Sequence, residues 1–283
     1  MNEITVSIII RTLNEEMRLV ATLDMLYAQS VQCFEIIFLD SGSTDSTVDI
    51  IKRAQINHQN IKFRDISDIP FSFGRSLNIG CEMATGDFIS FLSAHCPPVS
   101  NVWLENYLVL MRTDSQIAGV YGKQVPFADA HPILILDEYQ IFDDLPREQN
   151  FPDVSFSNAN SFIRRSAWLT VPFNEDVTGG EDMLWAKSLL ELRWRIIYTP
   201  QSVVYHSHNE TLEQIRNRAY INYLTFYRYI KPNKTWISLF MSTGVRILKD
   251  VYQLCCRKQY RFIPLSFVVR LNQLIGRLKV YGK

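Results

Sequence analysis

Two adjacent acidic residues, Glu181 and Asp182, follow a pair of glycines and open an apolar helical pattern. Carboxylates at a helix start usually complement the helix dipole at the protein surface. A loop that contains glycines also lets one carboxylate enter a cleft, where it can take a proton from a hydroxyl nucleophile. Taken alone, the pair favours the dipole role, so a catalytic role needs support from other positions.

A second acidic motif, Asp-Ser-Gly-Ser-Thr-Asp at residues 40–45, directly follows an apolar run. Gly42 permits a tight turn, and the carboxylate of Asp40 can accept a hydrogen bond from the ring N–H of a pyrimidine. A plain turn followed by a helix cap requires the same residue types. Residues 12–15, Thr-Leu-Asn-Glu, offer the same two interpretations after an earlier apolar run.

Three of the five histidines stand where an apolar run ends. His206 and His208 follow the run at residues 202–205, and His95 follows another at residues 88–92. A lone histidine is usually structural. Two histidines at i and i+2, with a third at an equivalent place, favour a phosphate or metal role.

The elements that carry these residues alternate between strand and helix. Strands are expected at residues 6–10, 34–39, 61–65 and 88–92, and they alternate with helical patterns at 15–28, 48–54 and 77–84. This order predicts parallel βαβ units in an α/β sheet covered on both faces. Because such sheets bind ligands beyond the carboxyl ends of their strands, the polar motifs stand where a ligand site is expected.

Composition narrows the classes of protein. The 283 residues are 47% hydrophobic and carry a net charge of zero, which gives no support to nucleic-acid binding. The five cysteines form no C-x-x-C pair, so a reducing compartment is expected. We see no signal peptide and no apolar run of about 20 residues, so we expect a cytoplasmic protein.

Taken in order, these motifs resemble the family 2 glycosyltransferases of the GT-A fold over roughly residues 4–230. The likeness rests on residues 7–15, 38–45, 74–80, 84–92 and 180–182. It implies a Rossmann-like mixed sheet flanked by helices, and inverting transfer of a sugar from a nucleotide-diphosphate donor to a glycan acceptor.

Within that family, residues 91–97, 156–165 and 204–209 resemble bacterial rhamnosyltransferase-like members. This implies a dTDP-rhamnose donor and a glycan or lipid-linked acceptor in surface polysaccharide synthesis. Two alternatives stay open, namely a UDP-hexose or UDP-N-acetylhexosamine transferase and a non-catalytic nucleotide-sugar-binding protein.

The resemblance also assigns roles to single residues. It makes Asp182 the general base with Glu181 beside it, and it places the diphosphate or a metal at His95, His206 and His208. The nucleotide-binding positions that it implies are Thr12, Asn14, Glu15, Asp40, Gly42, Arg75, Asn78 and Ser93. Relatives carry Asp-x-Asp where this chain has Ser93-Ala94-His95, so dependence on a divalent metal such as Mn²⁺ or Mg²⁺ is an open question.

The carboxyl-terminal part has a different character. Residues 246–283 hold nine Lys or Arg and one acid, and the pattern from residue 211 onward is helical. We therefore expect a catalytic domain at 1–230 and a helical basic segment at 231–283. Two roles for that segment are equally favoured, peripheral docking on the inner face of a membrane and packing on the catalytic domain or a second copy of the chain.

Overall fold

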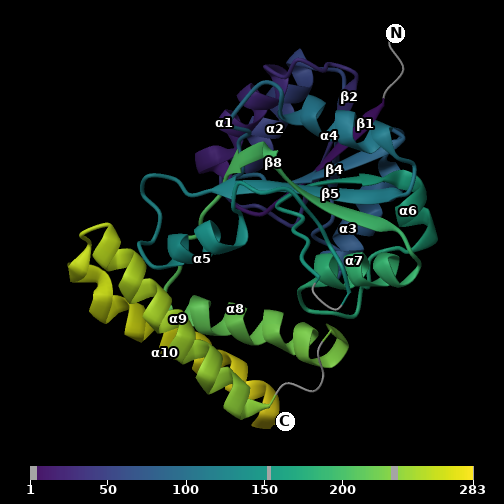
Figure 1. Cartoon of the computed structure of the whole chain (residues 1–283). Coiled ribbons are helices and arrows are strands. Elements are labelled where there is room, and N and C mark those ends of the chain that lie inside the picture. The colour runs from purple at the N-terminus through teal and green to yellow at the C-terminus, as the bar shows by residue number, and fades with distance from the viewer. Residues whose placement is uncertain (1–4, 152–153, 231–234, 283) are drawn as a thin grey trace. The chain divides into compact units, whose positions relative to one another are not determined.

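The computed structural model describes residues 5–151, 154–230 and 235–282. An eight-stranded mixed sheet in the order β3-β2-β1-β4-β7-β5-β8-β6 forms the centre of the first compact unit, the α/β unit of residues 1–125, 142–177 and 181–206 (Figure 1). The strands are β1 (Val6–Thr12), β2 (Phe34–Asp40), β3 (Ile61–Asp65), β4 (Phe88–Leu92), β5 (Ile117–Val125), β6 (Arg147–Glu148), β7 (Asn160–Arg164) and β8 (Arg195–Tyr205).

The first half of the sheet agrees with the predicted βαβ units. β1 pairs in parallel with β2 and β4, and β2 pairs in parallel with β3. Ile8 and Ile10 pack in one hydrophobic cluster and Ile9 in another, because successive side chains of a strand point to opposite faces. Both faces of β1 are therefore buried, which explains its unbroken apolar sequence.

Helices cover these faces. They are α1 (Glu16–Tyr27), α2 (Thr47–Asn57), α3 (Phe73–Met83), α4 (Trp103–Thr113), α6 (Arg165–Thr170) and α7 (Glu181–Glu191). Gly80 brings α3 close to the sheet, since a Cβ there would lie 2.7 Å from Cγ2 of Ile9. A larger residue at position 80 would push the helix away.

The second half of the sheet makes it mixed, as the resemblance implied. β7 runs antiparallel to both β4 and β5, and β8 runs parallel to β5. Two antiparallel steps restore the original direction, so β5 and β8 point the same way as β1 and β4. The carboxyl ends of six strands, β1 to β5 and β8, therefore lie at one edge of the sheet, together with the start of β7.

The remaining elements form a second compact unit of residues 126–141, 178–180 and 207–283. Its elements are α5 (Leu134–Ile141), α8 (Leu212–Thr225), the π-helical turn η1 (Phe226–Ile230), α9 (Trp236–Cys256), η2 (Tyr260–Phe262), α10 (Ile263–Leu278) and η3 (Lys279–Gly282). The domain boundary that we predicted at residues 230 and 231 lies at the edge of residues that the structure does not describe. By contacts the division comes earlier, after His206, so α8 belongs to the helical unit.

A buried ion cluster holds the helical unit together. Arg270 of α10 donates to both carboxylate oxygens of Asp250 on α9, each at 2.8 Å, and to Asp137 of α5 at 2.6 Å. Both Asp250 and Arg270 are almost completely buried. Among the described helices, none is both long and apolar enough to cross a membrane.

Candidate active site

The loop after β2 is organised by the carboxylate of Asp40. Its Oδ1 accepts hydrogen bonds from the hydroxyls of Thr12 (2.7 Å) and Ser43 (2.6 Å). Its Oδ2 accepts from the backbone N–H groups of Gly42 (3.0 Å) and Ser43 (2.8 Å). A carboxylate has about four acceptor sites. A pyrimidine N–H would therefore have to replace one of these bonds, so Asp40 in this structure holds the loop in shape.

The loop after β1 is tied to the loop after β2. Asn14 has a positive φ of 57°, and its side-chain oxygen accepts a hydrogen bond from the backbone N–H of Thr44 at 2.8 Å. The N–H of Glu15 donates to the hydroxyl of Thr47 at 2.7 Å. Gly42 also has a positive φ, 96°, which suits the tight turn predicted there. The two loops form one preorganised rim.

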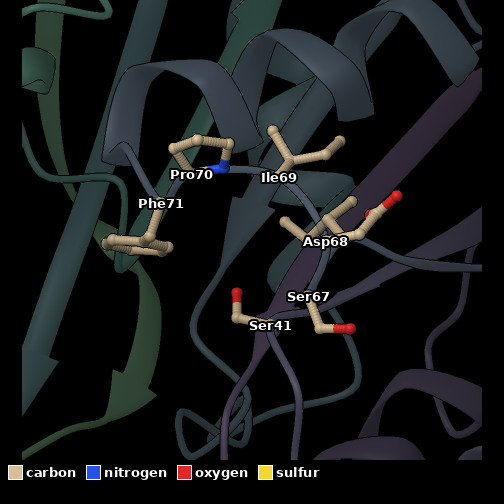
Figure 2. Close-up of a pocket in the computed structure, with 7 residues that line it drawn as sticks. Ser41, Ser67, Asp68, Ile69, Pro70 and Phe71 are labelled. Atoms are coloured by element: carbon tan, nitrogen blue, oxygen red, sulfur yellow. The ribbon is translucent and has the colours of Figure 1, made fainter.

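A cavity of about 430 Å³ lies next to this rim. Figure 2 shows Ser41, at the end of β2, facing the segment that follows β3. The lining combines polar groups of Ser41, Ser67 and Asp68 with an apolar wall, completed by Ile66, Ile69, Pro70 and Phe71.

The histidines predicted to act together do meet, at the ends of β4 and β8. The rings of His95 and His206 are stacked, with centroids 5.3 Å apart and planes 17° from parallel. Nδ1 of His95 lies 3.0 and 3.1 Å from the two carboxylate oxygens of Glu15. Nδ1 of His206 lies against the side-chain oxygen of Gln124. Because both partners are oxygen acceptors, these contacts are hydrogen bonds when each ring has its proton on Nδ1, and Nε2 is then the ring atom that can bind a cation.

This arrangement fits a cation site. Metal-binding histidines usually donate their second ring N–H to a carboxylate or carbonyl oxygen, as His95 and His206 do. Their ligand atoms lie within 4.8 Å of each other. His208 belongs to the helical unit, but the chain keeps its Cα within about 7 Å of that of His206. Imidazole ligands suit Mn²⁺ or Zn²⁺ better than Mg²⁺.

Ser93 lies in the turn between β4 and His95. Its N–H donates to the carbonyl of Ala159 at 3.2 Å, and its own carbonyl accepts from Cys96 at 2.9 Å. These bonds join the end of β4 to the segment that leads into β7. Ser93 thus helps to fix the turn that carries His95.

The acidic pair opens α7, as predicted. Glu181 is buried, and Asp182 is partly buried. Oδ2 of Asp182 accepts a hydrogen bond from the backbone N–H of Asn158 at 3.3 Å, and Oδ1 accepts from Met183 at 2.8 Å. Burial, and then repulsion by Glu181, raises the pKa of Asp182 to about 7. A carboxylate in that state has the proton affinity that a general base requires near neutral pH.

Arg11, at the end of β1, supplies a positive charge near the acidic pair. Its guanidinium donates to the carbonyl of Phe73 at 3.3 Å and stacks over that ring at 5.0 Å. Burial lowers the pKa of Arg11, and the charges of Glu181 and Asp182 act in the opposite direction. The cation in turn opposes the rise in the pKa of Asp182.

Arg75 and Asn78 are occupied with the loop before α7. The amide of Asn78 donates to the carbonyl of Phe173 and to Glu175, and its oxygen accepts from Trp168 and from the N–H of Phe173, all at 3.0 Å. Arg75 donates to Glu175 at 2.9 Å. A contact between Asn78 and a sugar donor would require breaking one of these bonds. In this structure Arg75 and Asn78 therefore position the loop.

Three residues of this edge were not predicted from the sequence: Arg11, Gln124 and Asn158. Arg11 was readable as a charged residue directly after a buried apolar run. Gln124 and Asn158 gave no usable signal, because their neighbours are known only once β5 and β7 are in place. In the part of the chain that the structure describes, the side-chain nitrogen of Asn158 is buried with no hydrogen-bond partner.

The fold matches known nucleotide-sugar enzymes. A mannosyltransferase of Pyrobaculum calidifontis, solved with GDP-Man and Mn²⁺, superposes with a TM-score of 0.69 at 18% identity, over 98% of this chain and 87% of that one. This likeness shows that the chain has the GT-A fold, a mixed sheet with polar loops at one edge. The chain belongs to glycosyl transferase family 2, whose model matches residues 7–168.

Two relatives are similar over most of the chain. The O-antigen chain rhamnosyltransferase RfbN of Salmonella typhimurium is 27% identical over 96% of this chain and 88% of the relative. The O-antigen chain rhamnosyltransferase WbaN of Salmonella anatum is 28% identical over 88% of this chain and 80% of the relative. The predicted fold, family and enzyme class are confirmed.

Proposed function

We propose that this glycosyltransferase moves L-rhamnose from dTDP-rhamnose to a glycan or lipid-linked glycan acceptor, with inversion at the anomeric carbon. The names of the two relatives above support the sugar and the acceptor class. The observation that carries the mechanism is the partly buried carboxylate of Asp182, whose pKa is raised to about 7, at the ligand edge of the sheet.

In this mechanism the acceptor hydroxyl attacks the anomeric carbon while the bond to the nucleotide diphosphate breaks. The proton of the hydroxyl passes to Asp182, and the electron pair of the broken bond leaves with the diphosphate. Single displacement inverts the configuration. Asp182 suits the base role better than Glu181, because Glu181 is buried and its charge serves to raise the proton affinity of its neighbour.

Asn158 contributes a donor on the same side. Its backbone N–H holds Oδ2 of Asp182, and its side-chain oxygen accepts from Ser161 at 3.0 Å. The buried side-chain nitrogen is left for a sugar oxygen. Leaving a buried amide without a partner is unfavourable, so a ligand that supplies an acceptor gains affinity there.

The nucleotide side uses the rim and the adjoining cavity. We propose that Ser41 and Asp68 meet the polar edge of the base, while Ile69 and Phe71 face its 5-methyl group. Thr12, Asn14, Asp40 and Gly42 hold the rim in shape, and Arg75 and Asn78 hold the loop that leads to α7. A methyl group against an apolar wall favours thymine over uracil.

The leaving diphosphate gains negative charge and needs positive charge close by. We propose that His95 and His206 would hold a divalent cation that neutralises it, and His208, two residues further along the chain, is an additional candidate ligand. Glu15 then orients His95 instead of contacting the nucleoside. Since two hard carboxylate ligands of relatives are missing, we expect weaker dependence on Mg²⁺ than in those relatives.

A donor screen tests this proposal. Purified protein with dTDP-rhamnose, UDP-glucose and UDP-N-acetylglucosamine should release nucleotide diphosphate fastest from dTDP-rhamnose, and NMR of the product should show the inverted anomer. Preference for a UDP-sugar would refute the donor, and retained configuration would refute the displacement. Binding of these nucleotides without any turnover would indicate a non-catalytic protein.

If the acceptor is lipid-linked, the enzyme works at the inner face of a membrane. We propose this peripheral location for the enzyme, which the helical unit supports through its basic charge.

A further inference from the structure

Helix α9 carries an apolar stripe on the surface of the helical unit. Large hydrophobic side chains that are half or more exposed recur at helical spacing along 21 residues. They are Trp236, Ile237, Phe240, Met241, Val245, Leu248 and Tyr252. At 100° per residue, those from Ile237 onward cover an arc of about 140° on one side of the helix.

The opposite side of α9 is packed. Its buried residues are Leu239, Thr243, Asp250 and Leu254. Asp250 is held by the bidentate contact with Arg270. The buried side of α9 therefore holds the helix in the helical unit, and the apolar stripe lies on its exposed side.

Helix α10, which packs on α9, repeats the pattern. Val269, Arg270 and Leu274 are buried, whereas its other side exposes Phe267, Val268, Leu271 and Ile275 by 40–54%. Eleven large hydrophobic side chains of two neighbouring helices thus face solvent. Scattered exposed residues need no explanation, but stripes along two amphipathic helices mark an interaction surface.

The charge around these stripes has one sign. Across the described residues 235–282 the one acid is Asp250, and it is fully buried against Arg270. The exposed basic residues are Lys249, Arg257, Lys258, Arg261 and Lys279. Three of them lie in the turn between α9 and α10, so the exposed surface of this helix pair offers cations and no carboxylate.

We propose that the outer face of α9, together with the exposed side of α10, docks on an anionic lipid bilayer, with α9 lying in the plane of the interface. Apolar side chains enter the boundary between headgroups and acyl chains, and the lysines and arginines meet lipid phosphates. Trp236 and Tyr252 stand at the two ends of the stripe, where amphipathic rings suit the headgroup level.

The charge argues against a second copy of the chain as the occupant. A two-fold interface through α9 and α10 would bring the same basic residues of both copies together with no exposed acid of these two helices to offset them. An anionic bilayer neutralises these charges. This inference rests on the proposed membrane location of the enzyme and identifies the surface that contacts the membrane.

The test is flotation of the full chain with vesicles of phosphatidylcholine, alone or with 30 mol% phosphatidylglycerol. We expect binding to the mixed vesicles, weak binding to the neutral ones, and loss at 1 M salt, where the screening length falls to about 3 Å. The variants Phe240→Gln/Leu248→Gln/Tyr252→Gln and Lys249→Gln/Lys258→Gln/Arg261→Gln should each lower the partition coefficient by about tenfold or more.

Matched controls come from the α/β unit. Met17→Gln/Val20→Gln/Ile56→Gln removes three exposed apolar side chains, and Lys52→Gln/Arg53→Gln/Arg64→Gln removes three exposed charges. Both should bind vesicles as the wild type does. Circular dichroism and thermal melts show whether each variant is folded.

Three outcomes overturn the proposal: no binding to anionic vesicles, equal loss in the controls, or a dimer in sedimentation that only the α9 variants dissociate. Transfer to a short water-soluble acceptor is measured separately. A chain that transfers sugar but ignores vesicles overturns the docking face alone, and a chain that binds vesicles but transfers nothing overturns the enzymatic proposal alone.

Discussion

Two regions lie at the same edge of the sheet: the loops after β1 and β2, and the segments around β7 and α7. They differ in how far their polar side chains are satisfied by hydrogen bonds within the protein. Asp40 accepts four hydrogen bonds, three from Gly42 and Ser43 of its own loop and one from Thr12 at the end of β1. Asp182 is held by two backbone N–H groups, with a pKa raised by burial, and the buried nitrogen of Asn158 next to it has no partner among the described residues.

This difference separates a frame from a reactive site. A saturated carboxylate stabilises the loops and has little left to offer a ligand. A carboxylate whose charge is unfavourable in the folded protein is ready to take up a proton. We infer that the first half of the sheet shapes the nucleotide side, and that the second half carries the transfer chemistry.

The largest effect is expected from Asp182→Asn. Loss of a general base should lower turnover by roughly 10²–10⁴-fold, while the fold and nucleotide affinity stay unchanged because the rim is untouched. Steady-state kinetics and calorimetric titration with nucleotide check both parts.

Glu181→Gln is the matched control, since it removes the neighbouring charge but keeps the base. We expect it to retain more turnover than Asp182→Asn. An inactive Glu181→Gln beside an active Asp182→Asn would move the base to Glu181 and reverse the assignment.

The second effect concerns the cation that we propose His95 and His206 bind. Glu15→Gln keeps the shape of the side chain but weakens its bond to Nδ1 of His95, and outer partners of this kind are worth about 10–100-fold in metal affinity. Titration with Mn²⁺ and Zn²⁺ measures the loss, and His95→Ala should lose more.

Activity after treatment with EDTA gives a second measurement. Residual turnover that Mn²⁺ raises more than Mg²⁺ does is the expected result. Turnover that EDTA abolishes and Mg²⁺ alone fully restores would contradict reduced metal dependence, and an unaffected His95→Ala would remove this histidine from the site.

The sequence predicted the frame better than the reactive half. β1, β2 and β4 were readable because each is largely apolar and buried on both faces, and the loops after β1 and β2 carry their turn chemistry locally, as Gly42 does. β5 and β7 take their places through antiparallel pairing between distant segments, which no local pattern encodes. Gln124 and Asn158 were missed for that reason.

The same limit applies to individual roles. The acidic pair, the meeting of His95 with His206, and the edge that carries them could be expected from strand order. The four hydrogen bonds that Asn78 makes within the protein could not be expected from the sequence, because Trp168 and Phe173 come close to Asn78 only in the folded chain. The predicted nucleotide contacts of Asn78 and Asp40 stay predictions.

A smaller effect tests the frame directly. Asp40→Ala leaves the hydroxyl of Thr12 and two loop N–H groups without their acceptor, so it should lower the free energy of unfolding by about 1–3 kcal/mol in urea titrations. Thr12→Val removes one of these bonds and should have less effect.

Asp182→Asn supplies the contrast in the same experiment. The raised pKa means that the folded state binds more protons than the unfolded state between about pH 4 and 7, so ionisation of Asp182 lowers stability as pH rises through that window. The asparagine variant should therefore be at least as stable as the wild type at pH 8. Destabilisation by both variants alike would erase the distinction between frame and reactive site.

The smallest effect comes from Arg11, which links the two halves. Its charge opposes the rise in the pKa of Asp182, but burial and Glu181 contribute more, so its removal should raise that pKa only a little further. In Arg11→Met, Asp182 should stay protonated to higher pH, so the acidic limb of the kcat/KM profile should move to higher pH. Arg11→Lys keeps the charge and should restore the wild-type limb even if its affinity for donor differs. Methionine lacks the positive charge that lysine keeps, so an effect of charge must differ between the two variants. An acidic limb that stays in place in Arg11→Met, or that moves equally in both variants, would show that Arg11 acts only through packing on Phe73.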